Sequence, residues 1–170
     1  SDVCSSDLAD EARMRLAQVM GALSADAGMP GVLVPAAAVL SCVVPALERP
    51  WKAALSRTCT GRVLTVGPGL KTGMPVHYDD PAEIGPDRIA DAVAARAVYG
   101  SPCIVIDLGT TTNIEVIDVR GTFVGGVIAP GLALGARSLS AAAARLPQVE
   151  PSAPTHVIGR NTREAMRSGV

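Results

Sequence analysis

The sequence predicts an α/β fold, and two observations carry that prediction. Short apolar runs of strand length alternate with segments of helical periodicity, and Gly or Pro stands at most of the junctions. The 170 residues suffice for one ordinary domain or parts of two, and 48% of them are hydrophobic. Aromatic residues make up only 2%, so the core must be built from aliphatic side chains.

The first half of the chain predicts two helices and two strands. Apolar residues at helical spacing predict an amphipathic helix over about residues 10–25. The apolar run 39–44 predicts a buried parallel strand that Pro45 ends, and a second helix follows over 46–57. Residues 62–66 predict another strand, which a Gly-Pro-Gly turn closes.

The second half predicts a three-stranded meander between helices. After the long polar loop 70–84, a helix is expected over residues 86–99, beginning with a proline at its favoured first position. Alternating or continuous apolar runs then predict strands, and Arg120-Gly121 predicts a turn between the last two. The predicted strands are 104–107, 113–119 and 123–129, followed by helices over 132–144 and from Thr162 onward.

Charge and composition exclude several classes of protein. The formal net charge is −1 and no run of Lys and Arg occurs, which argues against nucleic-acid binding. The uncharged stretch 27–47 is long enough to span a bilayer, but its prolines break a helix, so no membrane span is expected. Four cysteines without a CxxC pair suit a reducing, cytoplasmic setting.

The two ends of the chain suggest a fragment. The first residue is not Met, residues 1–8 show no usable pattern, and the last helix continues to the final residues. We therefore expect residues 1–8 to be a non-native or disordered leader. Residues 9–100 are expected to form an incomplete first domain, and residues 101–170 the start of a second.

The segment Asp107-Leu108-Gly109-Thr110-Thr111-Thr112 is a candidate phosphate site. A strand ends in a carboxylate, and a tight turn with glycine and three hydroxyl groups follows. Such a turn offers backbone N–H groups and hydroxyls to a phosphate, while Asp107 is a suitable ligand for a cation. The alternative is an ordinary hairpin whose polar residues satisfy the turn.

Gly85-Pro86-Asp87-Arg88 opens a predicted helix and is the second candidate. A helix N-terminus offers free N–H groups and a positive field to an anionic ligand. Asp87 could accept a proton from a substrate hydroxyl, and Arg88 could pair with a carboxylate. The alternative is a helix cap in which Asp87 stabilises the helix dipole.

Three further features have both a structural and a functional interpretation. Tyr78, in the polar loop, is either a ligand wall or a partly buried ring. Asn161 and Glu164 form a plausible capping box, to which a ligand contact from Thr162 would be an addition. The paired glycines 125 and 126 would permit a close backbone approach.

Four segments in order resemble the type III pantothenate kinases. They are VGPGLKTGMPVHYDDPAEIGPDRIADAVAA, CIVIDLGTTTNIEVID, GGVIAPG and IGRNTREAMRSG, and the resemblance covers nearly everything from about residue 9 to residue 170. It implies a duplicated ribonuclease-H-like fold of the actin-like ATPase superfamily, with βββαβαβα domains that are incomplete here at both ends. It also implies transfer of the γ-phosphate of ATP to pantothenate at the entry to coenzyme A synthesis, by a homodimer using magnesium and a monovalent cation, potassium or ammonium.

The resemblance also implies a role for individual residues. The general base falls on Asp87, the monovalent-cation ligand on Asp107 and a nucleotide contact on Thr110. The family usually has a small residue where Thr111 stands and Thr where Asn113 stands. The pantothenate contacts fall on Tyr78, Gly85, Pro86, Asp87, Arg88 and Thr162.

One motif of the family has no counterpart among the 170 residues. The family begins with a strand and a phosphate loop of the type DxGNT, so we expect the chain by itself to be inactive or nearly so. Two alternatives stay open. One is a non-catalytic accessory or regulatory homologue of the same superfamily, which would have no need for a base at Asp87. The other is an actin-like kinase that acts on a sugar or an acid.

Overall fold

The computed structural model describes residues 2–170 and divides them into two compact units, each considered by itself. The first unit runs to Gly73 and includes 79–93, and the second consists of 74–78 and 94–170. The division between residues 93 and 94 falls within the helix Pro86–Tyr99, whereas the sequence suggested a boundary at residue 100.

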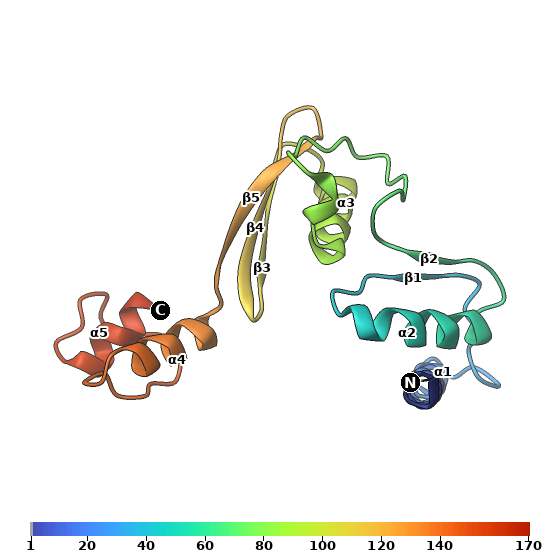
Figure 1. Ribbon diagram of the computed structural model, residues 1–170, viewed down its shortest axis with the longest axis horizontal. Coiled ribbons are helices and arrows are strands. Elements are labelled where there is room, and N and C mark those ends of the chain that lie inside the picture. Colours follow the sequence, from blue (N-terminus) through green and yellow to red (C-terminus); the bar gives the residue numbers. More distant parts are fainter. Residues whose placement is uncertain (1) are drawn as a thin grey trace. The chain divides into compact units, whose positions relative to one another are not determined.

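The elements (Figure 1) are α1 (Asp2–Asp26), β1 (Ala38–Leu40), α2 (Pro45–Thr58), β2 (Val63–Thr65), η1 (Pro81–Glu83), α3 (Pro86–Tyr99), β3 (Cys103–Leu108), β4 (Thr111–Ile117), β5 (Phe123–Pro130), α4 (Leu132–Ala142) and α5 (Thr162–Gly169).

The first helix begins earlier than the sequence suggested. Helix α1 includes residues 2–8, which belong to the segment expected to be a non-native or disordered leader. No proline or glycine occurs between Asp2 and Met20 to stop a helix, and the helix therefore extends through the segment. Ser24 is 3% exposed, and its hydroxyl accepts a hydrogen bond from the Leu33 N–H at 2.6 Å, which ties down the chain after the helix.

Helices α1 and α2 pack against each other, and α2 also contacts the small sheet of the first unit (Figure 1). Ala12 on α1 and Ala54 on α2 are almost fully buried, which is consistent with a close approach of the two backbones. Strands β1 and β2 pair in parallel, as predicted. The prediction of a buried strand here is wrong, because Val39 is 66% exposed.

The second unit contains the predicted meander. Strands β3, β4 and β5 pair antiparallel in that order, with Asp107 opposite Asn113 and Ile106 opposite Ile114 (Figure 1). The register shifts between Val116 and Ile117. Gly125 pairs with Val116 and has a φ of +125°, a conformation that glycine adopts readily. This irregularity brings Phe123 opposite Ile117.

The two faces of this sheet differ in chemistry. One face carries Asp107, Asn113, Glu115, Ile117 and Phe123, and the last four of these side chains are buried. The other face is aliphatic and largely exposed, which is typical of a surface that packs against another element or chain. Its members, by register, are Ile104, Ile106, Leu108, Ile114, Val116 and Val127.

The turn between β4 and β5 is held by one carboxylate. Asp118 Oδ1 accepts hydrogen bonds from the backbone N–H groups of Arg120 and Thr122, both at 2.9 Å, and Oδ2 accepts from Arg120 Nε at 3.2 Å. Gly121 follows with a φ of +75°, so the predicted Arg120-Gly121 turn is confirmed. The hydrogen bond from Thr122, followed by the contacts with Arg120, lowers the pKa of Asp118 below its ordinary value of 3.8.

Stability should therefore depend on pH through Asp118. A carboxyl whose pKa is lower in the folded state stabilises the fold above its unfolded pKa, and this contribution is lost as the pH falls through the folded pKa. We expect Asp118→Asn to reduce the loss of unfolding free energy on going from neutral pH to below 3.8. Urea denaturation at both pH values measures it. An identical loss in the variant and the parent would contradict the prediction.

Within the described residues, no helix combines the length and the apolar character needed to cross a membrane. The uncharged stretch 27–47 instead contains a loop, strand β1 and the first residues of α2, which begins at Pro45.

Candidate functional site

The first group of candidate residues lies at the start of α3. The helix begins at Pro86, as predicted, and the N–H of Ile89 donates to the carbonyl oxygen of Gly85 at 3.2 Å. Asp87 Oδ1 accepts a hydrogen bond from the Arg88 N–H at 2.9 Å. A Cβ atom at residue 85 would lie only 2.5 Å from Asp87 Oδ1. Glycine is therefore needed at residue 85 for the carboxylate of Asp87 to keep this position.

Asp87 and Arg88 differ in exposure. The side chain of Asp87 is half-buried, so a bound molecule can reach its carboxylate. Arg88 is only 6% exposed, so its guanidinium group belongs largely to the interior. The hydrogen bond to the Arg88 N–H satisfies one of the free donors of the first turn, as a cap does. The bond involves only Oδ1 of the carboxylate, so the geometry suits the capping role and the role of a base equally.

Tyr78 is held by the second unit. The segment 74–78 runs beside the start of β5, where Phe123 N–H donates to Pro75 O at 2.9 Å and His77 N–H donates to Phe123 O at 2.8 Å. The rings of Tyr78 and Phe123 lie 6.1 Å apart between centroids, at 53°. A Cβ atom at Gly125 would lie an ordinary 3.9 Å from the Tyr78 ring, so this contact does not by itself require glycine there.

Asp107 and Thr110 lie at the turn that joins β3 to β4. Asp107 is half-buried, Thr110 is exposed, and the N–H of Gly109 donates to the Thr111 carbonyl at 2.9 Å. The hydroxyl of Thr111 donates to Asn113 Oδ1 at 3.2 Å. Thr111 and Asn113, two positions where the resemblance led us to expect other residues, thus contact each other, so their side chains are coupled in this chain.

The donor atoms around Asp107 suit a hard cation. Its carboxylate stands opposite the buried amide of Asn113 in the sheet register, and both groups present oxygen atoms, the ligands that such cations prefer. The described part of the chain has no group of three or more His, Cys, Asp or Glu side chains that could hold a metal ion. Further ligands of a cation at Asp107 would therefore come from backbone, hydroxyl or amide oxygens or from a nucleotide.

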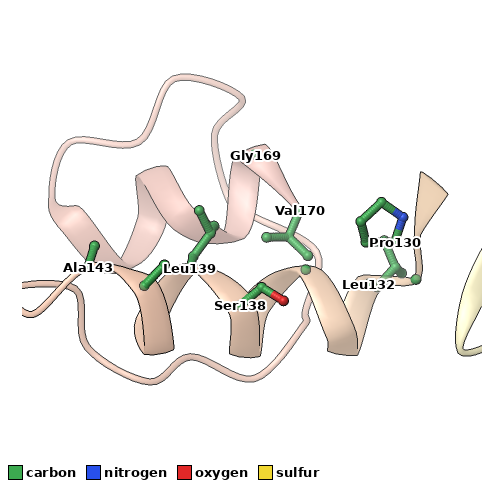
Figure 2. Close-up of a pocket in the computed structure, with 10 residues that line it drawn as sticks. Pro130, Leu132, Ser138, Leu139, Ala143, Gly169 and Val170 are labelled. Atoms are coloured by element: carbon green, nitrogen blue, oxygen red, sulfur yellow. The ribbon is translucent and has the colours of Figure 1, made fainter.

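A feature beside this turn was missed by the sequence reasoning. The N–H of Gly131 donates to the carbonyl oxygen of Thr110 at 2.9 Å, which joins the turn to the start of α4. Gly131 also lines an apolar cavity of about 520 Å³. Figure 2 shows Leu139 of α4 and Val170, which follows α5, among the residues that line this space. The Pro130-Gly131 pair was visible in the sequence, but the sequence indicated only that a helix begins after it, and not that Gly131 contacts the turn.

Thr162 opens α5. Asn161 is the N-cap, and its Oδ1 accepts a hydrogen bond from the Glu164 N–H at 3.0 Å. Glu164 Oε2 in turn accepts from the Arg160 N–H at 3.1 Å, which completes the reciprocal arrangement expected of a capping box, shifted by one residue. Thr162 itself is exposed, so its side chain is accessible to a ligand.

The structure therefore assembles the candidates in two groups. Gly85, Pro86, Asp87 and Arg88 belong to the first unit, where they share one helix end. The candidates in the second unit are Tyr78, Asp107, Thr110 and Thr162, and of these Asp107 and Thr110 share one hairpin.

The sequence comparisons with known proteins point to one family. The family profile of the type III pantothenate kinases matches residues 3–170. A relative from Koribacter versatilis, named type III pantothenate kinase, is 47% identical over 131 residues, which are 77% of this chain and 48% of the relative. Relatives of the same name from Shouchella clausii and Acidobacterium capsulatum are each 44% identical, covering 77% and 78% of this chain and 51% and 48% of their own lengths.

The chain thus spans about half the length of the curated relatives it matches. Among solved structures, a Campylobacter jejuni protein described as belonging to a Baf family of transcriptional activators is 23% identical, with a TM-score of 0.42 over 65% of this chain and 57% of that one. A likeness of this size supports no argument about fold or activity. The profile match over nearly the whole sequence, together with relatives of one name at 44–47% identity, shows that the chain belongs to the type III pantothenate kinase family.

Proposed function

We propose that this chain is the part of a pantothenate kinase that carries the general base and one of the phosphate-binding hairpins. The reaction would be ATP-dependent phosphorylation of pantothenate to 4'-phosphopantothenate, the first step of coenzyme A synthesis. The observation that carries the proposal is the carboxylate of Asp87, which is half-buried and fixed at the start of α3 by the space at Gly85 and the Arg88 N–H.

Asp87 would act on the primary hydroxyl of pantothenate. As the hydroxyl oxygen forms its bond to the γ-phosphorus, the bond from that phosphorus to the oxygen of the ADP leaving group breaks. The carboxylate of Asp87 takes the hydroxyl proton in the same step, because an alcohol is otherwise a poor nucleophile. The rest of the catalysis is positioning and neutralisation of charge, which the turn amides and bound cations supply.

Further residues would position pantothenate. The substrate carries a carboxylate, for which the buried guanidinium of Arg88 is a suitable partner, since a bidentate pair fixes orientation as well as charge. Gly85 and Pro86 would contact the substrate from the same helix start. Tyr78 and Thr162 would supply two further contacts, the first from a ring already held against Phe123.

The second unit would hold ATP. An apolar cavity of about 520 Å³ has the size and character of a small-molecule site, and a flat nucleobase suits it. Because Gly131 joins the cavity to the Gly109–Thr111 turn, a base in the cavity would have its phosphates near Thr110. Magnesium carried with ATP and a potassium or ammonium ion at Asp107 would neutralise phosphate charge.

The finer fold assignment belongs to the same proposal. A three-stranded antiparallel meander followed by a helix in the second unit, and a parallel pair with its helices in the first, fit parts of two actin-like βββαβαβα domains. A homodimer in the cytoplasm completes the proposal.

The test is a kinase assay on a chimaera in which this chain replaces the matching part of the Koribacter versatilis relative. Mass spectrometry should detect 4'-phosphopantothenate formed with ATP in potassium buffer, and turnover should fall when sodium replaces potassium. The 170-residue chain alone should show no turnover, because it has no DxGNT segment. Phosphorylation of a sugar or another acid in preference to pantothenate would assign a different substrate. A folded chimaera that binds pantothenate without turnover would favour the accessory function.

A further inference from the structure

The residue Gly131 belongs to two features of the second unit at once. Its N–H donates to the Thr110 carbonyl at 2.9 Å, so it is bonded to the turn between β3 and β4. Its own carbonyl accepts from the Gly135 N–H at 2.8 Å, and it is the N-cap residue of α4. Gly131 is buried and lines the apolar cavity between α4 and α5 (Figure 2).

Space, and not backbone conformation, requires glycine at this position. The φ of Gly131 is −68° and its ψ is 161°, a combination open to every residue. A Cβ atom there would overlap the carbonyl oxygen of Gly109 and would lie 2.6 Å from that of Thr110. Both obstructing atoms are backbone atoms of the turn, so a side chain could be accommodated only if the turn moved away.

Gly135 provides the contrast. It lies one helical turn further along α4 and lines the same cavity, yet a Cβ atom there would meet only Val170 Cγ1, at an ordinary 3.7 Å. A methyl group at residue 135 would thus change the volume of the cavity without touching the turn. Substitutions at the two glycines can therefore distinguish an effect on the cavity alone from an effect on its connection to the turn.

We propose that Gly131 is a positioning residue that fixes the Gly109–Thr111 turn at a set distance from the cavity, so that one nucleotide engages both. The proposal rests on the proposed function, in which the cavity takes the base of ATP and the turn takes its phosphates. Gly131 acts through the backbone of Gly109 and Thr110 and has no group of its own that takes part in the chemistry.

The experiment compares Gly131→Ala with Gly135→Ala in the 170-residue chain. NMR titrations with adenosine and with ATP give two affinities for each protein, and their ratio measures what the phosphates add. Gly131→Ala should reduce that ratio by about tenfold or more, because the turn no longer stands where the phosphates lie. Gly135→Ala should change both affinities together and leave the ratio at its parental value. An unchanged ratio in Gly131→Ala would overturn the proposal.

Two measurements keep this test separate from that of the proposed function. In Gly131→Ala, the amide signals of Gly109, Thr110 and Thr111 should shift further than in Gly135→Ala, with no nucleotide present. In the unmodified chain, the Gly131 amide should exchange with solvent slowly, because it donates a hydrogen bond to the Thr110 carbonyl. Exchange at the rate of an amide without a hydrogen bond would overturn the proposal. This measurement does not depend on whether the Gly131→Ala variant folds. If the parent binds neither adenosine nor ATP, the nucleotide site fails, while the shifts and the exchange rate still decide the role of Gly131.

Discussion

Changing Asp87 to asparagine in the kinase chimaera is expected to lower kcat for pantothenate phosphorylation by about 10²–10⁴-fold. Asparagine has nearly the same shape as aspartate, and its side-chain oxygen can still accept the hydrogen bond from the Arg88 N–H. The start of α3 and substrate binding should therefore be preserved, while no carboxylate remains to take the hydroxyl proton. Steady-state kinetics should show the loss in kcat, with a much smaller change in KM for pantothenate.

Asp80 offers a matched control for this variant. Its Oδ1 accepts a hydrogen bond from the Ala82 N–H at 2.9 Å at the start of the short helix η1, so it caps a helix much as Asp87 does. Asp80→Asn should keep the parental kcat. A loss of less than about tenfold in Asp87→Asn, or an equal loss in Asp80→Asn, would mean that Asp87 serves only as a cap.

The second large effect is expected at Phe123. Its side chain is fully buried, and its backbone is bonded on both sides to the segment 74–78. Phe123→Ala should lower the unfolding free energy of the second unit by about 3–5 kcal/mol, the usual cost of removing a buried phenyl group. It should also release Tyr78, whose ring contacts that of Phe123 at a tilt of 53°. Hydrogen exchange at the amides of β4 in increasing urea measures the loss.

Two comparisons make the Phe123 result specific. Val124, the next residue, is 38% exposed, so Val124→Ala should cost far less. Trp51, the sole tryptophan, lies on α2 in the first unit, and its fluorescence reports that unit separately. A destabilisation by Phe123→Ala no larger than that by Val124→Ala would show that Phe123 does not hold the second unit together.

The local features of the fold were within reach of the sequence. The meander, the Arg120-Gly121 turn, the start of α3 at Pro86 and the cap at Asn161 all lie where the pattern predicted. Each depends on residues close together in the chain, through strand alternation, turn propensity or helix capping. The candidate residues could be named for the same reason, since each group forms one short motif.

The family was also set by the sequence, whereas the surroundings of the candidate residues were decided by contacts between distant segments. Tyr78 rests on Phe123, and Gly131 bonds to Thr110, although 45 and 21 residues respectively separate them in the numbering. Burial also depends on distant segments. The apolar neighbours of Val39 predict a core residue, yet Val39 is exposed because its two-stranded sheet leaves that side uncovered. The alternation and spacing of apolar residues predict on which face of a strand or helix a residue lies. Only the tertiary structure determines whether that face is covered, and by which other segment.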